Sequence, residues 1–244
     1  MRTKRLRIFA GPNGSGKSSI EDLVSSKYNI GNLINADKIE QTLRKKGQLS
    51  FNTYGITVTT SELKKFIATS GFNQKTDLSE LSFNLTVSKN ILKLKSLDIP
   101  YAYLGAILSE LIRNKSLDGK RTFSFETVMS HPAKLDFIKE AKAKGFKTYL
   151  YFVCTESVTI NIDRVQSRVD LGGHPVPIDK IKSRYKRSLD LLADAVKLAD
   201  RAFIFDNSEQ NKTILLAEKD EDKLHILESE VPLWFHTYLI KKLT

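Results

Sequence analysis

The stretch that decides the fold is Leu6-Arg7-Ile8-Phe9-Ala10-Gly11-Pro12-Asn13-Gly14-Ser15-Gly16-Lys17-Ser18-Ser19-Ile20-Glu21-Asp22-Leu23. It begins with a short apolar run, continues through a loop rich in glycine and serine, and ends in a helix-like segment, so the predicted order is strand, loop, helix. Gly11 to Ser18 match the pattern G-x-x-x-x-G-K-[ST] in full, which in this context is the signature of a P-loop. The alternative is a glycine turn with an incidental lysine, and the flanking strand and helix disfavour it.

The physical chemistry of this loop predicts a nucleoside triphosphate, ATP or GTP, as its ligand. Glycines permit backbone conformations closed to other residues, so that successive N–H groups can converge on a phosphate. The N-terminus of the following helix adds partial positive charge. We expect Lys17 to bridge the β- and γ-phosphates as a catalytic residue and the Ser18 hydroxyl to coordinate Mg²⁺. The expected nucleotide-binding residues are Gly11, Pro12, Asn13, Gly14, Ser15, Gly16, Lys17, Ser18, Ser19 and, after a later strand, Asn207.

The rest of the chain predicts an α/β fold of three layers, with a mainly parallel sheet of about five strands. Further strands are expected at 33–35, 121–125, 147–154 and 201–205, separated by segments long enough for crossover helices. Near the C-terminus, residues 213–217 and 224–227 flank a polar run and predict a β-hairpin. We interpret residues 1–244 as a single domain with an insertion after the second strand.

The insertion, at about 42–118, has the spacing of helices. One apolar face comprises Leu78, Leu81, Leu85 and Leu92, and another comprises Tyr101, Leu104, Leu108 and Leu111. Because nucleotide kinases commonly carry their acceptor-binding segment at this place, we expect the insertion to shape acceptor specificity. Tyr101 and Tyr103 either present their rings to that pocket or pack on the leucine stripe, and packing is the preferred interpretation.

The composition favours anionic partners and excludes a disulfide scaffold. The 244 residues carry a formal net charge of +11 and a single cysteine, Cys154, which lies in an apolar run that predicts a buried strand. No apolar stretch approaches the length of a membrane span, and the N-terminus lacks the features of a signal peptide. We therefore expect a cytoplasmic protein without a membrane partner. Nucleic acid is not expected as the primary partner, because no recognised binding motif accompanies the charge.

Three carboxylates follow predicted strands, where the ligand crevice of an open α/β sheet lies. Asp37 is the candidate catalytic base that accepts the proton of the acceptor hydroxyl, and its alternative role is a first-turn helix acid. Glu126 and Thr127 are expected to contact the substrate. Glu126 is also expected to lie near Mg²⁺, either in direct contact or with a water molecule between its carboxylate and the ion. Its alternative is a surface acid that opens the next helix. For Asp206 we favour a structural or base-side role over metal binding, because Asn207 and Ser208 follow it as turn formers.

These residues together resemble the zeta toxin family of P-loop kinases. The resemblance covers most of the chain outside the insertion, and its more particular features are Phe-Ser-Phe-Glu-Thr at 123–127, Gly-Gly-His-Pro-Val-Pro at 172–177 and Arg184 to Leu189. It implies phosphorylation of a hydroxyl on a small molecule, which in the toxins is a UDP-activated amino sugar, and an antitoxin-like protein partner. Asp37 would match the catalytic aspartate, Glu126 the substrate-site glutamate, and Arg164 the first of two lid arginines.

The second lid arginine has no direct match in this sequence. His174 stands in its neighbourhood, with Arg168, Arg184 and Arg187 nearby. Arg164 and Arg168 are four residues apart and share a helix face, so they could neutralise charge that develops on a transferring phosphoryl group, or form a solvated face. We predict catalytic roles for both, and contact with the substrate for His174 and Arg184.

Two other classes of function remain open from the sequence. A nucleotide hydrolase would use water as the acceptor, and a nucleotide-regulated binding protein would bind tightly without turnover. A phosphotransferase is the preferred interpretation; phosphate release without an added metabolite would favour the hydrolase, and tight nucleotide binding without either activity would favour the binding protein.

Overall fold

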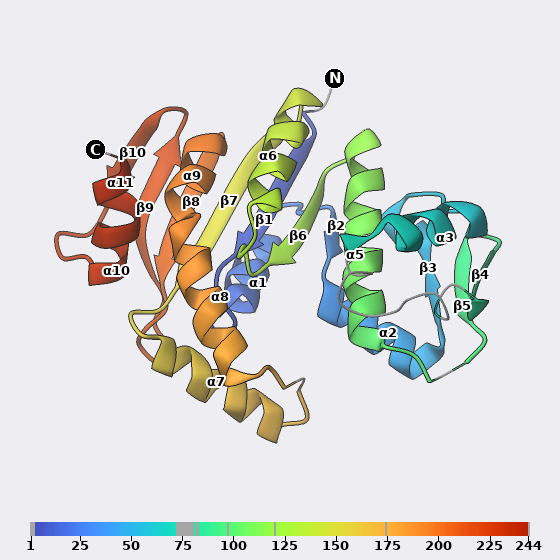
Figure 1. The fold of residues 1–244 in the computed structure, drawn as a ribbon. Coiled ribbons are helices and arrows are strands. Elements are labelled where there is room, and N and C mark those ends of the chain that lie inside the picture. The colour runs from blue at the N-terminus through green and yellow to red at the C-terminus, as the bar shows by residue number, and fades with distance from the viewer. Residues whose placement is uncertain are drawn as a thin grey trace. The chain divides into compact units, whose positions relative to one another are not determined.

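The computed structural model describes residues 3–71, 81, 83–96, 98–119, 121–173 and 175–243. The chain divides into two compact units (Figure 1). The first contains Met1–Ile30 and Glu126–Thr244, and the second contains Gly31–Phe125. The P-loop and the C-terminal half therefore belong to one unit, and the predicted insertion belongs to the other.

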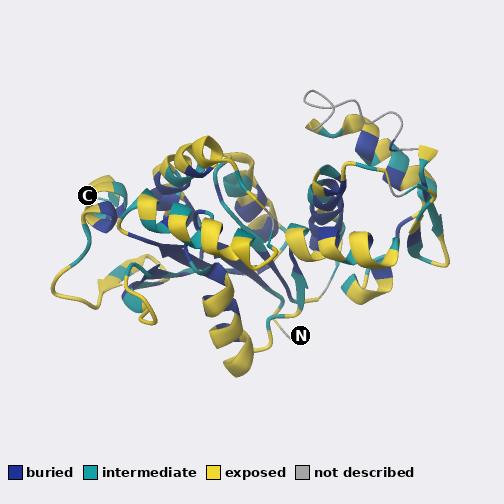
Figure 2. Ribbon diagram, turned by 90° about the horizontal axis from the view of Figure 1, so that it is seen from below, coloured by how far each residue is buried: buried dark blue, intermediate teal, exposed yellow. Residues whose placement is uncertain are grey.

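A sheet with the strand order β10-β9-β8-β7-β1 forms the centre of the first unit. Three of these strands are parallel, in a register that aligns Ala10 with Phe152 and Cys154 with Asp206. Their residues are mostly apolar and buried, as expected for strands covered on both faces (Figure 2). The strands are β1 (Arg5–Ala10), β7 (Lys147–Cys154), β8 (Arg201–Asp206), β9 (Ile214–Asp220) and β10 (Lys223–Ile226).

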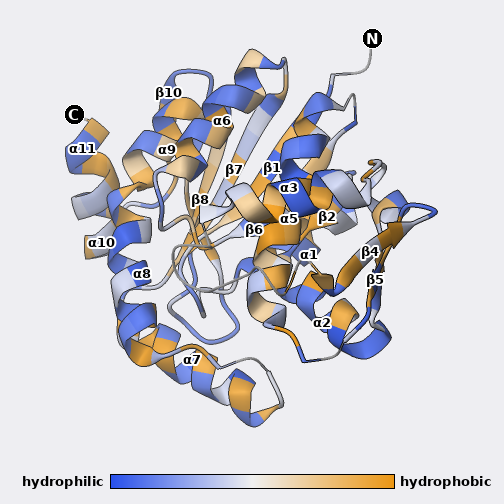
Figure 3. Cartoon of the chain, turned by 45° about the vertical axis from the view of Figure 1, so that its right-hand side comes forward, coloured by the Kyte–Doolittle hydropathy of each residue, from blue (hydrophilic) through white to orange (hydrophobic). Residues whose placement is uncertain are grey.

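Helices cover this sheet, and hydrophilic and hydrophobic residues alternate along them (Figure 3). Helix α1 packs against β1 and β7, and helices α6 and α9 pack against each other and against β7. The arrangement is the one that parallel strands joined by crossover helices require. The helical elements are α1 (Lys17–Lys27), α6 (Ala133–Ala143), α7 (Val158–Asp170), α8 (Ile178–Asp190), α9 (Leu192–Leu198), α10 (Leu233–Phe235), η3 (His236–Ile240) and α11 (Lys241–Leu243).

The second unit contains the second predicted strand and the insertion. Strand β2 (Asn32–Ile34) pairs in parallel with the first three residues of β6 (Phe123–Thr127). Helix α2 (Ala36–Lys46) packs against α5 (Tyr101–Asp118). The side chain of Asn35 caps α2, because its Oδ1 atom accepts a hydrogen bond from the backbone N–H of Lys38 at 3.0 Å.

The fold class is confirmed, since the structure has every predicted strand, a mainly parallel arrangement and the C-terminal β-hairpin. The expected face of Tyr101, Leu104, Leu108 and Leu111 is also confirmed, because all four are buried on α5. Tyr101 is buried, as the preferred interpretation of a packing residue expects, and the guanidinium of Arg44 lies 4.5 Å from the centre of its ring. No helix among the described residues is long and apolar enough to cross a membrane.

The insertion is not only helical, and this part of the expectation was wrong. Leu85 and Leu92, which were assigned to one helix face, lie on two antiparallel strands instead. Lys89 and Asn90 between them have φ values of 50° and 62°, the backbone of a tight two-residue hairpin turn. Leu81 is buried as predicted, and Leu78 lies outside the described residues. The added elements are β3 (Gln48–Ser50), η1 (Phe51–Tyr54), α3 (Thr60–Thr69), β4 (Leu85–Ser88) and β5 (Ile91–Leu94), with sheet order β3-β5-β4.

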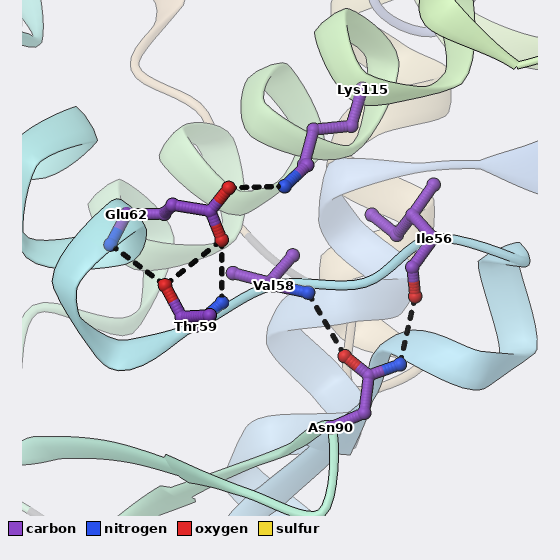
Figure 4. A network of polar contacts seen from close by, with 6 residues as sticks. All are labelled: Ile56, Val58, Thr59, Glu62, Asn90 and Lys115. Carbon is purple, nitrogen blue, oxygen red and sulfur yellow. Dashed lines mark hydrogen bonds and ion pairs between the residues drawn. The ribbon is translucent and has the colours of Figure 1, made fainter.

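A polar network fixes the start of α3 within the second unit (Figure 4). The Glu62 carboxylate accepts hydrogen bonds from the backbone N–H of Thr59 at 2.7 Å and from Lys115 Nζ at 2.8 Å. Asn90 joins the hairpin to the preceding loop, because its side chain bonds the N–H of Val58 and the carbonyl of Ile56. Polar contacts therefore link α3, α5 and the β4–β5 turn.

Replacing Glu62 with Gln should remove part of the acid dependence of the stability of this unit. Hydrogen bonds from Lys115 and Thr59 lower the pKa of Glu62 to about 2, from an ordinary value of 4.5. The stabilisation is therefore complete above pH 4.5 and is lost as the pH falls towards 2. Because the carboxylate is half-exposed, we expect a loss of about 0.5–1 kcal/mol at pH 7. Urea unfolding of both proteins from pH 2 to 7 would measure it, and a difference that does not shrink towards pH 2 would contradict the prediction.

Candidate phosphate-binding site

The P-loop leaves the end of β1 and leads directly into α1, as the sequence predicts. Gly14 has a φ of +77°, and a Cβ there would lie 2.5 Å from the carbonyl oxygen of Asn161. Gly16 has a φ of +95°, and its Cβ would lie 2.1 Å from Nδ2 of Asn207. At Gly14 the positive φ and the Asn161 backbone both exclude a side chain; at Gly16 the positive φ disfavours one, and the Asn207 amide would have to move to admit it. The loop is therefore a backbone cradle in close contact with two asparagines from distant parts of the chain.

Lys17 is buried at the first position of α1, with only 7% of its surface exposed. Its Nζ atom donates a hydrogen bond to the carbonyl oxygen of Pro12 at 2.9 Å and lies 3.4 Å from Oε1 of Glu126. A buried ammonium group is costly unless it is paired, and here a carboxylate and a carbonyl both face it. The structure thus brings together the lysine and the glutamate that the sequence singled out.

The hydroxyl and amide groups of the loop differ in their surroundings. Ser18 and Ser19 are exposed on the first turn of α1. The Oγ atom of Ser15 and the Oδ1 atom of Asn13 are buried and have no hydrogen-bond partner. Buried polar atoms are seldom left unpaired, so this loop has the composition of a site that binds a polar ligand. An anion fits it well, because the cradle combines N–H groups, a helix N-terminus and Lys17.

Asn207 has its side chain fully engaged by protein groups. Its Nδ2 atom donates to the carbonyl oxygen of Ser15 at 2.9 Å, and its Oδ1 atom accepts from the hydroxyl of Thr213 at 2.8 Å. Its backbone N–H donates to the carbonyl oxygen of Cys154 at 2.8 Å. Asn207 therefore joins the P-loop to Thr213 and to the end of β7, and the direct contact with the nucleotide that the sequence suggested stays a prediction.

Arg164 projects from α7 onto the loop that follows β8. Its Nη1 atom donates to the carbonyl oxygen of Asn207 at 2.7 Å, and Nη2 lies 3.4 Å from the carbonyl oxygens of Ser208 and Glu209. These acceptors are neutral, so a phosphate oxygen would compete strongly for the same guanidinium. The structure therefore places the guanidinium of Arg164 beside Asn207, which in turn contacts the P-loop at Ser15.

Asp206 has the structural role that was favoured for it. It is 5% exposed and accepts hydrogen bonds from the indole Nε1 of Trp234 at 2.8 Å and from the N–H and hydroxyl of Ser208. The Ser208 hydroxyl in turn accepts the N–H of Glu156 at 2.7 Å. This network anchors the loop that carries Asn207 to helix α10, which contains Trp234.

The remaining predicted residues are distributed over both units. Asp37 is exposed in the first turn of α2, in the second unit. Thr127 accepts the N–H of Gly11 on its carbonyl oxygen at 3.3 Å and so lies against the P-loop. Arg168 is exposed on α7 and Arg184 is half-buried on α8. His174 lies outside the described residues.

Cys154 is a buried strand residue, as predicted, and is unsuited to nucleophilic chemistry. Burial raises the pKa of its thiol to about 12, so the reactive thiolate does not form near neutral pH. Its neighbour Thr155 accepts a hydrogen bond on its carbonyl oxygen from the Tyr185 hydroxyl at 2.6 Å. Burial also raises the pKa of that Tyr185 hydroxyl.

Asn161 is the functional candidate that the sequence did not reveal. Its buried side chain donates to the carbonyl oxygen of Asn13 and accepts from the Thr155 hydroxyl. The local pattern around it, Thr159-Ile160-Asn161-Ile162, is ordinary for a helix. Only the fold shows that this residue lies against a loop 148 positions earlier in the chain.

Comparison with known proteins supports the fold assignment. No family model matches the chain. An uncharacterized protein of Haemophilus influenzae is 35% identical over 63 residues, which make up 26% of this chain and 45% of that protein. In the complex of AvrRxo1-ORF1 and AvrRxo1-ORF2, one structure with sulphate ions has a TM-score of 0.55 at 12% identity. A second structure of the complex, with ATP, has a TM-score of 0.54 at 14% identity.

Both AvrRxo1 comparisons cover 92% of this chain, which spans only 61% and 60% of the two matched chains. At these identities the similarity concerns the fold alone, and it agrees with the α/β fold built around the P-loop that the structure shows. The fold implied by the sequence resemblance is thus confirmed.

Replacing Gly14 with Ala should disrupt the cradle, whereas Gly172→Ala should not. Both glycines have a positive φ, of +77° and +85°, so both variants carry backbone strain of about 1 kcal/mol. Only the Gly14 variant also places a methyl group 2.5 Å from a carbonyl oxygen, since nothing lies within 4 Å of the position at Gly172. Calorimetric titration with ATP should show lost binding for Gly14→Ala alone. Equal ATP affinity of the two variants would contradict this view of the cradle.

Proposed function

We propose that the chain is a Mg²⁺-dependent phosphotransferase that moves the γ-phosphate of a nucleoside triphosphate to a hydroxyl group of a small molecule. The observation that carries this proposal is the P-loop with Lys17 buried between the Pro12 carbonyl and the Glu126 carboxylate. A lysine in this setting combines positive charge with a strand-end carboxylate at one site, as phosphoryl transfer requires.

ATP is the donor that we propose first, with GTP as its competitor in the test. One of the structures of similar fold was determined with ATP, and the P-loop itself recognises phosphates rather than a base. When the triphosphate is bound, Mg²⁺ would neutralise charge on its phosphate oxygens, with the Ser18 hydroxyl as its protein ligand and Glu126 close by or joined through water. No three His, Cys, Asp or Glu among the described residues form a cluster for a resident metal. We expect the Mg²⁺ ion to be bound together with the triphosphate, as in other phosphoryl-transfer sites.

The protein groups proposed for the chemistry are those that the sequence pattern singled out. Asp37, exposed on α2, would accept the proton of the acceptor hydroxyl, and Glu126 and Thr127 would contact the acceptor. Arg164 would leave its carbonyl partners and contact the transferring phosphoryl group. Arg168, Arg184 and His174 are the further basic residues that the sequence places in the same segment of the chain. The resemblance to zeta toxins suggests a nucleotide sugar as one class of acceptor.

A protein partner is part of the proposal. The similar structures are of a complex between AvrRxo1-ORF1 and AvrRxo1-ORF2. A partner that covered the cradle of this chain would hold the phosphotransferase inactive, as the antitoxin-like partner implied by the sequence resemblance would.

Lys17→Met should abolish phosphoryl transfer while leaving the fold intact. Methionine is close to lysine in shape but cannot neutralise phosphate charge, so we expect a fall in turnover of at least about 10³-fold. Lys219→Met is the matched control, because Lys219 is also buried, donates to the carbonyls of Lys197 and Ala199, and lies on β9. Transfer rates with labelled ATP would compare the two. Full activity of the Lys17 variant would refute the proposed function.

Asp37→Asn and Arg164→Ala should lower turnover for different reasons. A base acts on the acceptor, so Asp37→Asn should keep its ATP affinity and lose roughly 10²–10⁴-fold in transfer rate. Arg164→Ala should lose about 10³-fold if its guanidinium stabilises the transferring group. Only the Asp37 variant should change the acid limb of the pH profile. Single-turnover rates across pH, with calorimetric ATP affinities, would test both; a normal rate for Asp37→Asn would assign the base to another residue, with Glu126 next.

A further inference from the structure

Asn161 joins the arginine-bearing helix α7 to the tip of the P-loop. Its side chain has no exposed surface. The Nδ2 atom donates to the carbonyl oxygen of Asn13, and Oδ1 accepts from the Thr155 hydroxyl at the end of β7. The backbone of Asn161 also lies against the P-loop, since a Cβ atom added to Gly14 would lie 3.1 Å from Cα of Asn161. A buried amide with both ends bonded is held in one orientation, and so is the group that it bonds.

Asn207 makes the corresponding contact two residues further along the loop. Its Nδ2 atom donates to the carbonyl oxygen of Ser15 at 2.9 Å. The carbonyls before Gly14 and before Gly16 are therefore each fixed by an asparagine amide. The two asparagines come from α7 and from the loop after β8, so the P-loop is supported by two separate segments.

Fixing these carbonyls also fixes the direction of two N–H groups. A trans peptide is planar, and its C=O and N–H point in opposite directions. If the Asn13 carbonyl points to Asn161, the N–H of Gly14 points away from Asn161, and the same holds for the N–H of Gly16 relative to Asn207. N–H groups directed to one side of such a loop are the donors that bind a phosphate. The orientation is set by residues that themselves need not contact the ligand.

We propose that Asn161 is a positioning residue of the phosphate site, which orients the Asn13–Gly14 peptide for the triphosphate. This role rests on the proposed function, because it requires a nucleotide in the cradle. Without the amide donor, the peptide can rotate and the Gly14 N–H loses its direction. Nucleotide affinity should then fall, even in a protein that remains folded. A residue that only fills space would change stability and leave the affinity unchanged.

Two variants and one control distinguish a positioning role of Asn161 from a role in packing alone. Asn161→Asp keeps the shape and the bond from Thr155 but removes the donor to Asn13, and Asn161→Ala removes the whole amide. Thr148→Val is the control, since Thr148 is also fully buried in the same unit and its hydroxyl bonds Asp200. Thr148 lies at the opposite end of β7 from Thr155, roughly 20 Å away at the rise of an extended strand.

The experiment is calorimetric titration with MgATP well below the melting temperature of each variant, together with thermal melting. We expect the Kd for ATP to rise at least tenfold in both Asn161 variants and to stay within twofold of the wild-type value in Thr148→Val, although all three melt at lower temperature. An Asn161→Asp protein that is folded and binds ATP as tightly as the wild type would overturn the proposal. A wild-type chain that binds no ATP would instead refute the proposed function, and this role with it.

Discussion

The close packing of the P-loop backbone is the constraint on which the rest of the site depends. At Gly14 and Gly16 neighbouring atoms occupy the space that a side chain would need, at 2.5 and 2.1 Å from the ideal Cβ positions. The loop therefore runs between β1 and α1 in a path that side chains at these positions would disturb. That path brings Lys17 to the Glu126 carboxylate at 3.4 Å and leaves Ser18 exposed on the first helical turn. A ligand with several negative charges is the natural partner of such an arrangement.

The parallel register of the first unit produces this packing. Since β1, β7 and β8 run in the same direction, the segments that follow them meet at one edge of the sheet. The P-loop follows β1, Thr155 and α7 follow β7, and Asn207 follows β8. The hydrogen bonds of Asp206 to Trp234 and Ser208 then hold the last of these segments in place. Basic groups, the cradle and their supports thus come from three strand ends within one compact unit.

The parts of this site that sequence could predict are those with a local pattern. The P-loop is contiguous, and the rule that ligands lie beyond strand ends was enough to select Glu126. Asn161 gives no such signal, because its partners Asn13 and Thr155 are fixed by the fold and its neighbours read as ordinary helix. The insertion was predicted as helical for a related reason. Leu85 and Leu92 are seven residues apart, which fits one face of a helix, but the same spacing also places both on one face of a hairpin that turns at Lys89 and Asn90. Asp37 was singled out by its place after β2, and its catalytic role remains a prediction.

The central claim is that the cradle serves phosphoryl transfer to an organic hydroxyl. The most direct measurement is incubation of the chain with ATP labelled in the γ-phosphate, Mg²⁺ and a metabolite extract, followed by separation of the labelled products. The account predicts label in a phosphorylated organic compound, formed only when the extract is present. Label found in inorganic phosphate alone, at a rate that the extract does not change, would contradict it and identify the chain as a hydrolase.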